Sequence, residues 1–151
     1  MSAVLIVDDD ERMRSLLARW LGSAGYDTCE AADAETALEQ LLAGGCDVAV
    51  CDVMMPGSGG LWLVERVRAQ CPAVAIVLAT GVAHVHPSVS LGGNVVEYLV
   101  KPFERADVVA AVALARAWHE SNVARTAPGA ADGDRLAAWL HTGRSRAPEV
   151  K

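Results

Sequence analysis

Short apolar runs recur along the chain, and segments with a helical repeat of apolar residues separate them. Runs of this length, rich in valine, leucine and isoleucine, are typical of strands buried on both faces of a parallel sheet. We therefore expect five strands in chain order. The strong runs cover residues 3–7, 48–51, 74–79 and 95–100, and a weaker one covers residues 27–31.

Between these runs, apolar residues recur at spacings of three and four, as they do on one face of a helix. Glycine follows the first two such segments and Pro72 follows the third, which predicts helix ends at these points. The last helix is predicted from about residue 104 to 120. Strands that alternate with helices predict a (βα)5 fold, with a parallel sheet and helices on both of its faces.

Two segments interrupt this regular order. Residues 82–94 contain a proline, two glycines and two serines, so we expect a short or partly irregular fourth helix there. Residues 127–133 are typical of a flexible linker, and Asp134 is a candidate cap for a short helix after it. The sequence thus predicts a domain over residues 1–120 and a linker with a short tail over residues 121–151.

Composition supports a folded domain and argues against general nucleic-acid binding. With 151 residues, 52% of them hydrophobic, the chain can form one domain with a full core. The net charge is −6, which would repel a phosphate backbone. Residues 1–120 carry 16 acidic and 8 basic side chains, whereas residues 121–151 carry 3 acidic and 5 basic ones. The tail therefore differs in composition from the rest of the chain.

Three features favour a cytoplasmic location and no membrane association. No stretch of about 18 or more apolar residues is present, so we expect no membrane span. The N-terminus leads directly into the first apolar run with no basic region ahead of it, so no signal peptide is expected. The four cysteines lack C-x-x-C spacing, and we expect them to be reduced thiols.

Two of the apolar runs end on carboxylates. Asp8 and Asp9 follow the first run, and Asp52 follows the run at 48–51. Because ligands of parallel sheets bind outside the carboxyl ends of the strands, these acids should meet at one edge. Like charges at such short range need a positive partner. Mg²⁺ takes hard oxygen ligands, often one or two carboxylates plus waters, so the sequence predicts a magnesium site there.

Other polar groups belong at the same edge. Thr80 comes just past the predicted fourth strand, and Lys101 comes just past the fifth. Acids, a cation and a hydroxyl donor suit phosphoryl transfer to a carboxylate, since a carboxylate can act as the nucleophile. Catalysis of that reaction depends mostly on positioning and on electrostatic stabilisation.

At these motifs the sequence resembles the receiver domain of bacterial two-component response regulators. The resemblance covers roughly residues 3–120, and it implies a flavodoxin-like (βα)5 doubly wound sheet with the strand order 2-1-3-4-5. Each motif is weak alone, but the four together in this order are specific. They are V-D-D-D-E at 7–11, D-V-M-M-P-G at 52–57, A-T-G at 79–81 and Y-L-V-K-P-F at 98–103.

The resemblance also implies roles for individual residues. It makes Asp52 the phosphoacceptor, with Lys101 contacting the phosphoryl group, and it places Mg²⁺ among Asp8, Asp9, Asp52 and the backbone carbonyl of Met54. It makes Thr80 the switch hydroxyl and Tyr98 the switch aromatic, and it implies a cis bond between Lys101 and Pro102.

By the same resemblance, a histidine kinase or phosphotransfer protein would phosphorylate the chain, which would signal through contacts with a downstream protein. Residues 121–151 are too few and too loosely patterned for a DNA-binding unit, so no direct DNA binding is expected, and a homodimer stays open. This is a signalling role rather than an enzyme activity. One alternative is a pseudo-receiver that works without phosphorylation. Another is a haloacid dehalogenase-type hydrolase, which is disfavoured because Met54 stands where that family needs a second Asp.

Overall fold

A computed structural model describes residues 3–81 and 93–126 of the chain. Within them, strands and helices alternate as the hydrophobic pattern predicts. The strands are β1 (Ala3–Val7), β2 (Thr28–Ala31), β3 (Cys46–Asp52), β4 (Ala75–Thr80) and β5 (Val95–Val100), and the helices are α1 (Glu11–Ser23), α2 (Ala34–Ala43), α3 (Gly60–Gln70) and α4 (Arg105–Thr126).

The five strands form one parallel sheet in the order β2-β1-β3-β4-β5. This order confirms the predicted flavodoxin-like, doubly wound fold. The central strands are almost entirely buried, and every residue of β4 is shielded from solvent. Long unbroken apolar runs are therefore found where helices cover both faces of the sheet.

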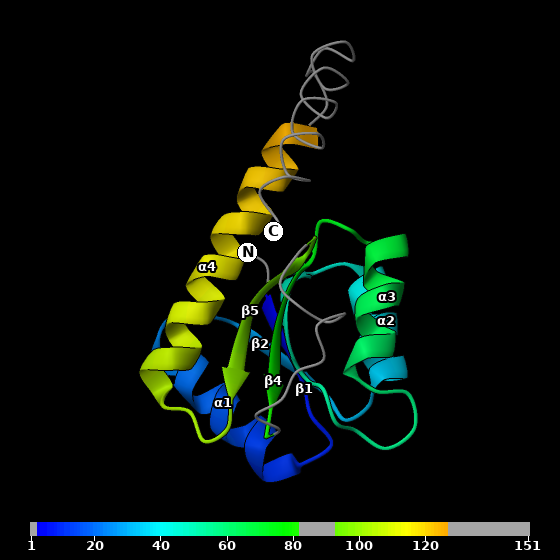
Figure 1. Ribbon diagram of the computed structural model, residues 1–151. Helices are drawn as coiled ribbons and strands as arrows, with labels where there is room; N and C mark the ends of the chain where they lie inside the picture. Colours follow the sequence, from blue (N-terminus) through cyan, green and yellow to red (C-terminus); the bar gives the residue numbers. More distant parts are fainter. Residues whose placement is uncertain (1–2, 82–92, 127–151) are drawn as a thin grey trace, which may run out of the picture. The chain divides into compact units, whose positions relative to one another are not determined.

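Helices cover the sheet in pairs, with α2 and α3 on one face and α1 and α4 on the other (Figure 1). Side chains of β1 and β3 alternate between the two resulting cores. Leu5 and Ala49 point into the core beneath α2 and α3, whereas Val4 and Val48 point into the core beneath α1 and α4. This alternation follows from the two-residue period of a strand.

Two aspartates define the starts of helices. The Asp10 side chain accepts a hydrogen bond from the backbone N–H of Arg12, and the Asp33 side chain accepts one from that of Thr36. A cap of this kind satisfies a backbone donor that the helix leaves free at its first turn. Asp10 therefore caps α1, directly after the acidic pair that follows β1.

The sequence prediction was wrong at some element boundaries. Strand β3 starts at Cys46 rather than at residue 48. Asp47 can lie within the buried strand because Arg116 forms an ion pair with its carboxylate. Helix α4 continues to Thr126 instead of ending near residue 120. No glycine or proline interrupts residues 121–126, so nothing in the local sequence stops the helix there.

Some predictions fall outside the described residues, namely most of the weak segment at 82–94, the linker at 127–133 and the short helix after Asp134. The chain divides into two units, residues 1–119 and residues 120–151. The domain boundary at residue 120 stays a prediction. Among the described helices, none combines the length and apolar character that a bilayer-crossing segment requires.

Candidate functional site

The structure brings three carboxylates together where β1 and β3 end. Single oxygen atoms of Asp8, Asp9 and Asp52 all lie within 4.8 Å of one another. Asp8 and Asp52 are buried, with 2% and 6% of their surfaces exposed, whereas Asp9 is exposed. The cluster therefore has two buried members and one that faces solvent. This geometry agrees with the expectation that the acids meet at one edge of the sheet.

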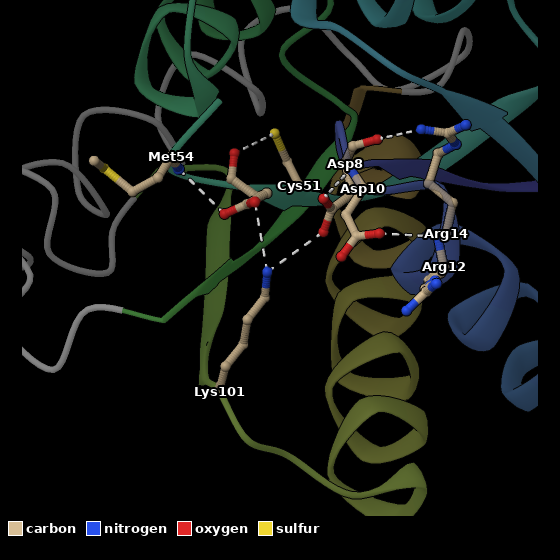
Figure 2. Close-up of polar contacts among 8 residues, drawn as sticks. Asp8, Asp10, Arg12, Arg14, Cys51, Met54 and Lys101 are labelled. Atoms are coloured by element: carbon tan, nitrogen blue, oxygen red, sulfur yellow. Dashed lines mark hydrogen bonds and ion pairs between the residues drawn. The ribbon is translucent and has the colours of Figure 1, made fainter. Parts of the chain in front are cut away.

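One cation lies between the two buried acids. The Lys101 ammonium Nζ is 3.5 Å from Oδ2 of Asp8 and 3.5 Å from Oδ2 of Asp52. Figure 2 shows its side chain extending from the end of β5 toward Asp8. The Lys101 backbone N–H donates a 2.7 Å hydrogen bond to the carbonyl of Thr80, which ties the β5 end to β4. The peptide bond between Lys101 and Pro102 is cis, as the resemblance implies.

The environment of Asp8 disfavours its charged form. Burial raises the pKa of the Asp8 carboxyl above its ordinary value, and the nearby Asp52 carboxylate adds to the effect. The backbone N–H of Asp10, 2.9 Å from Oδ1 of Asp8, and the Lys101 ammonium oppose that rise in pKa without cancelling it. The raised pKa of Asp8 therefore reflects burial first, with repulsion from Asp52 as a smaller contribution.

Asp52 is held at the close approach of β3 to α3. Its Oδ1 accepts a 3.1 Å hydrogen bond from the backbone N–H of Met54. A Cβ at Gly60 would lie 2.5 Å from the Asp52 carbonyl oxygen, so only glycine allows α3 to begin this close to the strand. The N–H of Gly60 also donates to the carbonyl of Val53. The first residue of α3 thus sets the backbone that carries Asp52.

The two predicted switch residues lie on β4 and β5. Thr80 ends β4 and is 1% exposed, so it belongs to the same sheet edge as Asp52 and Lys101. Tyr98 is half-buried on β5 and packs against the core beneath α2 and α3. Its hydroxyl oxygen is buried and has no hydrogen-bond partner among the described residues. Burial also raises the pKa of that hydroxyl.

The acidic cluster fits a hard divalent cation. Its donors are carboxylate oxygens, the ligand type that Mg²⁺ prefers. Two of these carboxylates are buried next to each other and repel, and the Lys101 ammonium lies 3.5 Å from both. A bound cation would relieve that repulsion. The Met54 carbonyl stays a predicted ligand, since the contact observed for Met54 involves its N–H.

Sequence reasoning missed two parts of the site. Arg14 on α1 donates from Nη1 to the main-chain carbonyl of Asp8 at 2.7 Å. Gly60 belongs to a glycine-rich stretch, and nothing in that stretch marks it as a contact of Asp52. The spacing of Arg14 from the acidic run offered a signal, because a residue on the first turns of a helix can reach back to the preceding strand end.

A family model confirms the resemblance found in the motifs. The model described as "Response regulator receiver domain" matches residues 4–113, well over half of the chain. The matched range contains the whole acidic cluster and Lys101.

Among curated proteins, the chain is similar to the Regulator of RpoS from Escherichia coli strain K12, with 38% identity over 102 residues. That alignment covers 66% of this chain and 30% of the relative. The Sensory transduction protein RegX3 of Mycolicibacterium smegmatis is 28% identical over 112 residues, which cover 74% of this chain and 49% of RegX3. The chain thus spans less than half the length of either protein.

Solved structures agree with the fold. A CheY-like receiver domain protein from Methanospirillum hungatei superposes with a TM-score of 0.74 at 26% identity, covering 81% of this chain and 98% of that one. The response regulator TrrA from Thermotoga maritima, solved in complex with Mg²⁺-BeF, gives a TM-score of 0.69 at 30% identity. That match covers 76% of this chain and 99% of TrrA.

Proposed function

The chain belongs to the receiver-domain family of response regulators, and we propose that it accepts a phosphoryl group on Asp52 in a Mg²⁺-dependent reaction. One observation carries this proposal. Asp8, Asp9 and Asp52 gather within 4.8 Å of one another, and Lys101 lies 3.5 Å from two of them. A nucleophile, two further oxygen ligands and a cation are the parts that transfer to a carboxylate needs.

Asp52 supplies the nucleophile, and one of its carboxylate oxygens forms the new bond to phosphorus. The bond from phosphorus to the donor, such as the ring nitrogen of a phosphohistidine, breaks at the same time, and the donor leaves with its electron pair. The Met54 N–H, 3.1 Å from Oδ1, and the Lys101 ammonium, 3.5 Å from Oδ2, orient the carboxylate before attack. Lys101 then faces the charge on the transferred group.

Asp8, Asp9, Asp52 and the Met54 carbonyl would hold Mg²⁺. The ion would supply positive charge to the oxygens of the transferring group. TrrA supports this assignment as a relative solved with Mg²⁺-BeF. Asp10 and Glu11 continue the acidic run but are not assigned to the ion, because Asp10 caps α1.

Thr80 and Tyr98 would carry the change outward. Phosphorylation adds negative charge at the sheet edge. That charge shifts the equilibrium between two conformations only if it interacts more favourably with one of them than with the other. Thr80 is the hydroxyl at the same edge. Tyr98 is suited to adopting a second side-chain conformation. Among residues 3–81 and 93–126, no hydrogen bond holds its buried hydroxyl in place. The proposed output is a contact with a downstream protein.

The proposed phosphoryl donor is a histidine kinase or phosphotransfer protein, and the proposed location is the cytoplasm. Family membership supports the class of donor. A domain of this family signals through partners, and the proposed activity is limited to its own phosphorylation and dephosphorylation.

Intact mass tests the proposal directly. The protein is incubated with Mg²⁺ and acetyl phosphate or phosphoramidate, next to Asp52→Asn and the matched control Asp10→Asn. Asparagine also caps helices, so the control keeps the start of α1. We expect a gain of one phosphate in the wild type and in Asp10→Asn, dependent on Mg²⁺ and absent in Asp52→Asn.

The alternative function predicts different results. A phosphorylation-independent pseudo-receiver would show no gain in mass and no stabilisation by Mg²⁺. A wild-type protein that binds Mg²⁺ but gains no phosphate would contradict the proposal for Asp52 while leaving the metal site intact. A gain that persists in Asp52→Asn would place the acceptor elsewhere.

A further inference from the structure

A guanidinium contacts the backbone of the acidic cluster. Arg14 on α1 donates from Nη1 to the Asp8 carbonyl oxygen at 2.7 Å, and its Nε lies 3.3 Å from Oε1 of Glu30 on β2. The Arg14 side chain is 16% exposed, so it is mostly covered, whereas that of Glu30 is 42% exposed. Figure 2 shows the Arg14 guanidinium directed at Asp8. One side chain thus joins α1, the end of β1 and β2.

The contacted carbonyl belongs to the peptide between two of the carboxylates. Because a peptide unit is planar, the Asp8 carbonyl, the Asp9 N–H and the Asp9 Cα share one plane. Fixing the Asp8 oxygen therefore constrains the position of the Asp9 Cα, from which the Asp9 side chain leaves the backbone. The Asp8 N–H donates to the Ala31 carbonyl at 3.2 Å, and Oδ1 of Asp8 accepts from the Asp10 N–H at 2.9 Å. Together with the Arg14 contact, hydrogen bonds hold the backbone N–H, the side chain and the backbone carbonyl of Asp8.

Charge and position predict opposite effects for this arginine. Its positive charge, in contact with the Asp8 carbonyl, would compete with a cation bound at the cluster, so removal of the charge alone would tighten Mg²⁺ binding. Its hydrogen bond holds two of the carboxylates in the arrangement observed, so removal of the bond would weaken Mg²⁺ binding. The sign of the change therefore separates the two roles.

We propose that Arg14 is a positioning residue of the Mg²⁺ site, acting through the Asp8 carbonyl, with Glu30 orienting its guanidinium. This inference rests on the proposed function, because it assigns Arg14 to the same metal site. Arg14 touches neither the ion nor the phosphoryl group. It sets the geometry of the peptide that carries the Asp8 and Asp9 ligands.

The melting temperature measured against MgCl₂ concentration tests the proposal, since a ligand that binds only the folded state raises stability according to its dissociation constant. The variant is Arg14→Ala and the matched control is Arg12→Ala. Arg12 lies on the same turn of α1, its side chain is exposed, and the contact observed for it comes from its backbone N–H, 2.9 Å from Asp10. Both variants remove one positive charge.

We expect the Mg²⁺ dissociation constant of Arg14→Ala to rise about tenfold, as is typical when a residue that orients metal ligands is removed. Arg12→Ala should bind Mg²⁺ as the wild type does or slightly more tightly. Phosphorylation of Arg14→Ala by acetyl phosphate should recover at saturating MgCl₂, because Asp52 and Lys101 are unchanged. A purely structural role would lower the metal-free melting temperature and leave the dissociation constant as it was.

A second variant tests the same role in case Arg14→Ala does not fold. Glu30→Gln keeps the Arg14 guanidinium and removes the charge that orients it, so we expect a smaller increase in the dissociation constant. An unchanged or tighter constant in both Arg14→Ala and Glu30→Gln, with the wild type binding Mg²⁺ and accepting phosphate, would overturn this inference alone. A wild type that neither binds Mg²⁺ nor gains phosphate would overturn the proposed function and this inference together.

Discussion

The Lys101 ammonium lies 3.5 Å from Oδ2 of Asp52, although 49 residues separate the two in the chain. The lysine side chain is 25% exposed and the aspartate side chain 8%, so the pair is formed at the boundary between core and solvent. Lys101 also lies 3.5 Å from Asp8. One positive charge thus faces two buried acids, in the place where we propose Mg²⁺ to bind.

Replacing Lys101 by methionine should tighten Mg²⁺ binding, on the order of fivefold, because a competing positive charge is removed from the cluster. The metal-free protein should melt at a lower temperature, since its carboxylates lose their compensating cation. Melting curves across a range of MgCl₂ concentrations would measure both effects. Lys101→Arg keeps the charge and should retain the wild-type response, and weaker binding in Lys101→Met would contradict this electrostatic account.

Gly60 is the point at which α3 touches the backbone of Asp52. A Cβ there would lie 2.5 Å from the Asp52 carbonyl oxygen and 3.0 Å from the Val53 Cα, so Gly60→Ala must push the helix and strand apart. We expect a loss of about 1–3 kcal/mol in the free energy of unfolding, typical of overpacking, together with weaker Mg²⁺ binding. Urea unfolding and a MgCl₂ titration would measure the two losses.

Gly22 on α1 is the matched control for that substitution. It is helical, and a Cβ added there would meet no neighbouring atom within 4 Å, so Gly22→Ala places a methyl group in open space. We expect that variant to be neutral or slightly more stable, by up to about 1 kcal/mol, because alanine favours the helix. Equal effects of the two substitutions would refute the close contact at Gly60.

The raised pKa of Asp8 implies a pH dependence of the metal-free protein. Since the folded state binds the Asp8 proton more tightly than the unfolded state, this carboxyl stabilises the fold below its ordinary pKa of 3.8. That contribution is lost as pH rises through the folded pKa, so Asp8 destabilises the metal-free fold at neutral pH. Asp8→Asn, which keeps the oxygen that accepts from Asp10, should therefore melt higher than the wild type at pH 7 in EDTA.

The gain from Asp8→Asn should shrink as pH falls toward 3.8, because the wild-type carboxyl then becomes neutral as well. Melting temperatures at a series of pH values in EDTA would follow it. A difference that is constant across pH would show that ionisation of Asp8 is not its source. In MgCl₂ the order should reverse, since the variant loses a proposed ligand.

A second buried charge cluster anchors α4 to the sheet away from the site. Asp47 on β3 lies 3.1 Å from Nη2 of Arg116 and 3.7 Å from Nε2 of His119, and its side chain is only 8% exposed. Asp47→Ala would leave the Arg116 guanidinium mostly buried without its carboxylate. We expect a loss of about 3 kcal/mol in unfolding free energy, measured by urea denaturation.

The control for Asp47→Ala is a substitution in a more exposed ion pair, that of Arg14 with Glu30. Glu30→Gln should cost less than about 1 kcal/mol, because solvent screens a pair whose acid is 42% exposed. A loss from Asp47→Ala no larger than that from Glu30→Gln would show that the buried pair contributes little to holding α4.

The hydrophobic pattern was enough to predict the five strands, the parallel sheet and the four described helices, although it placed the end of α4 too early. Each of those segments carries its own periodicity, and the turns between them contain glycine, proline or a capping aspartate. Asp8, Asp9 and Asp52 could be located as well, because the carboxyl ends of parallel strands share one edge whatever the packing details. These features depend on the local sequence and on a general rule of topology.

Tertiary structure decided the rest. The polarity of Asp47 argues against a buried strand position until Arg116, 69 residues later, supplies its charge partner. The contact of Arg14 with the Asp8 carbonyl and the closeness of Gly60 to Asp52 involve backbone atoms, which no side-chain pattern reports. The sequence by itself determined which elements form and which residues reach the sheet edge, because those depend on periodicity. Distances, burial and the partners of each charge depend on how the elements pack, and only the folded chain sets them.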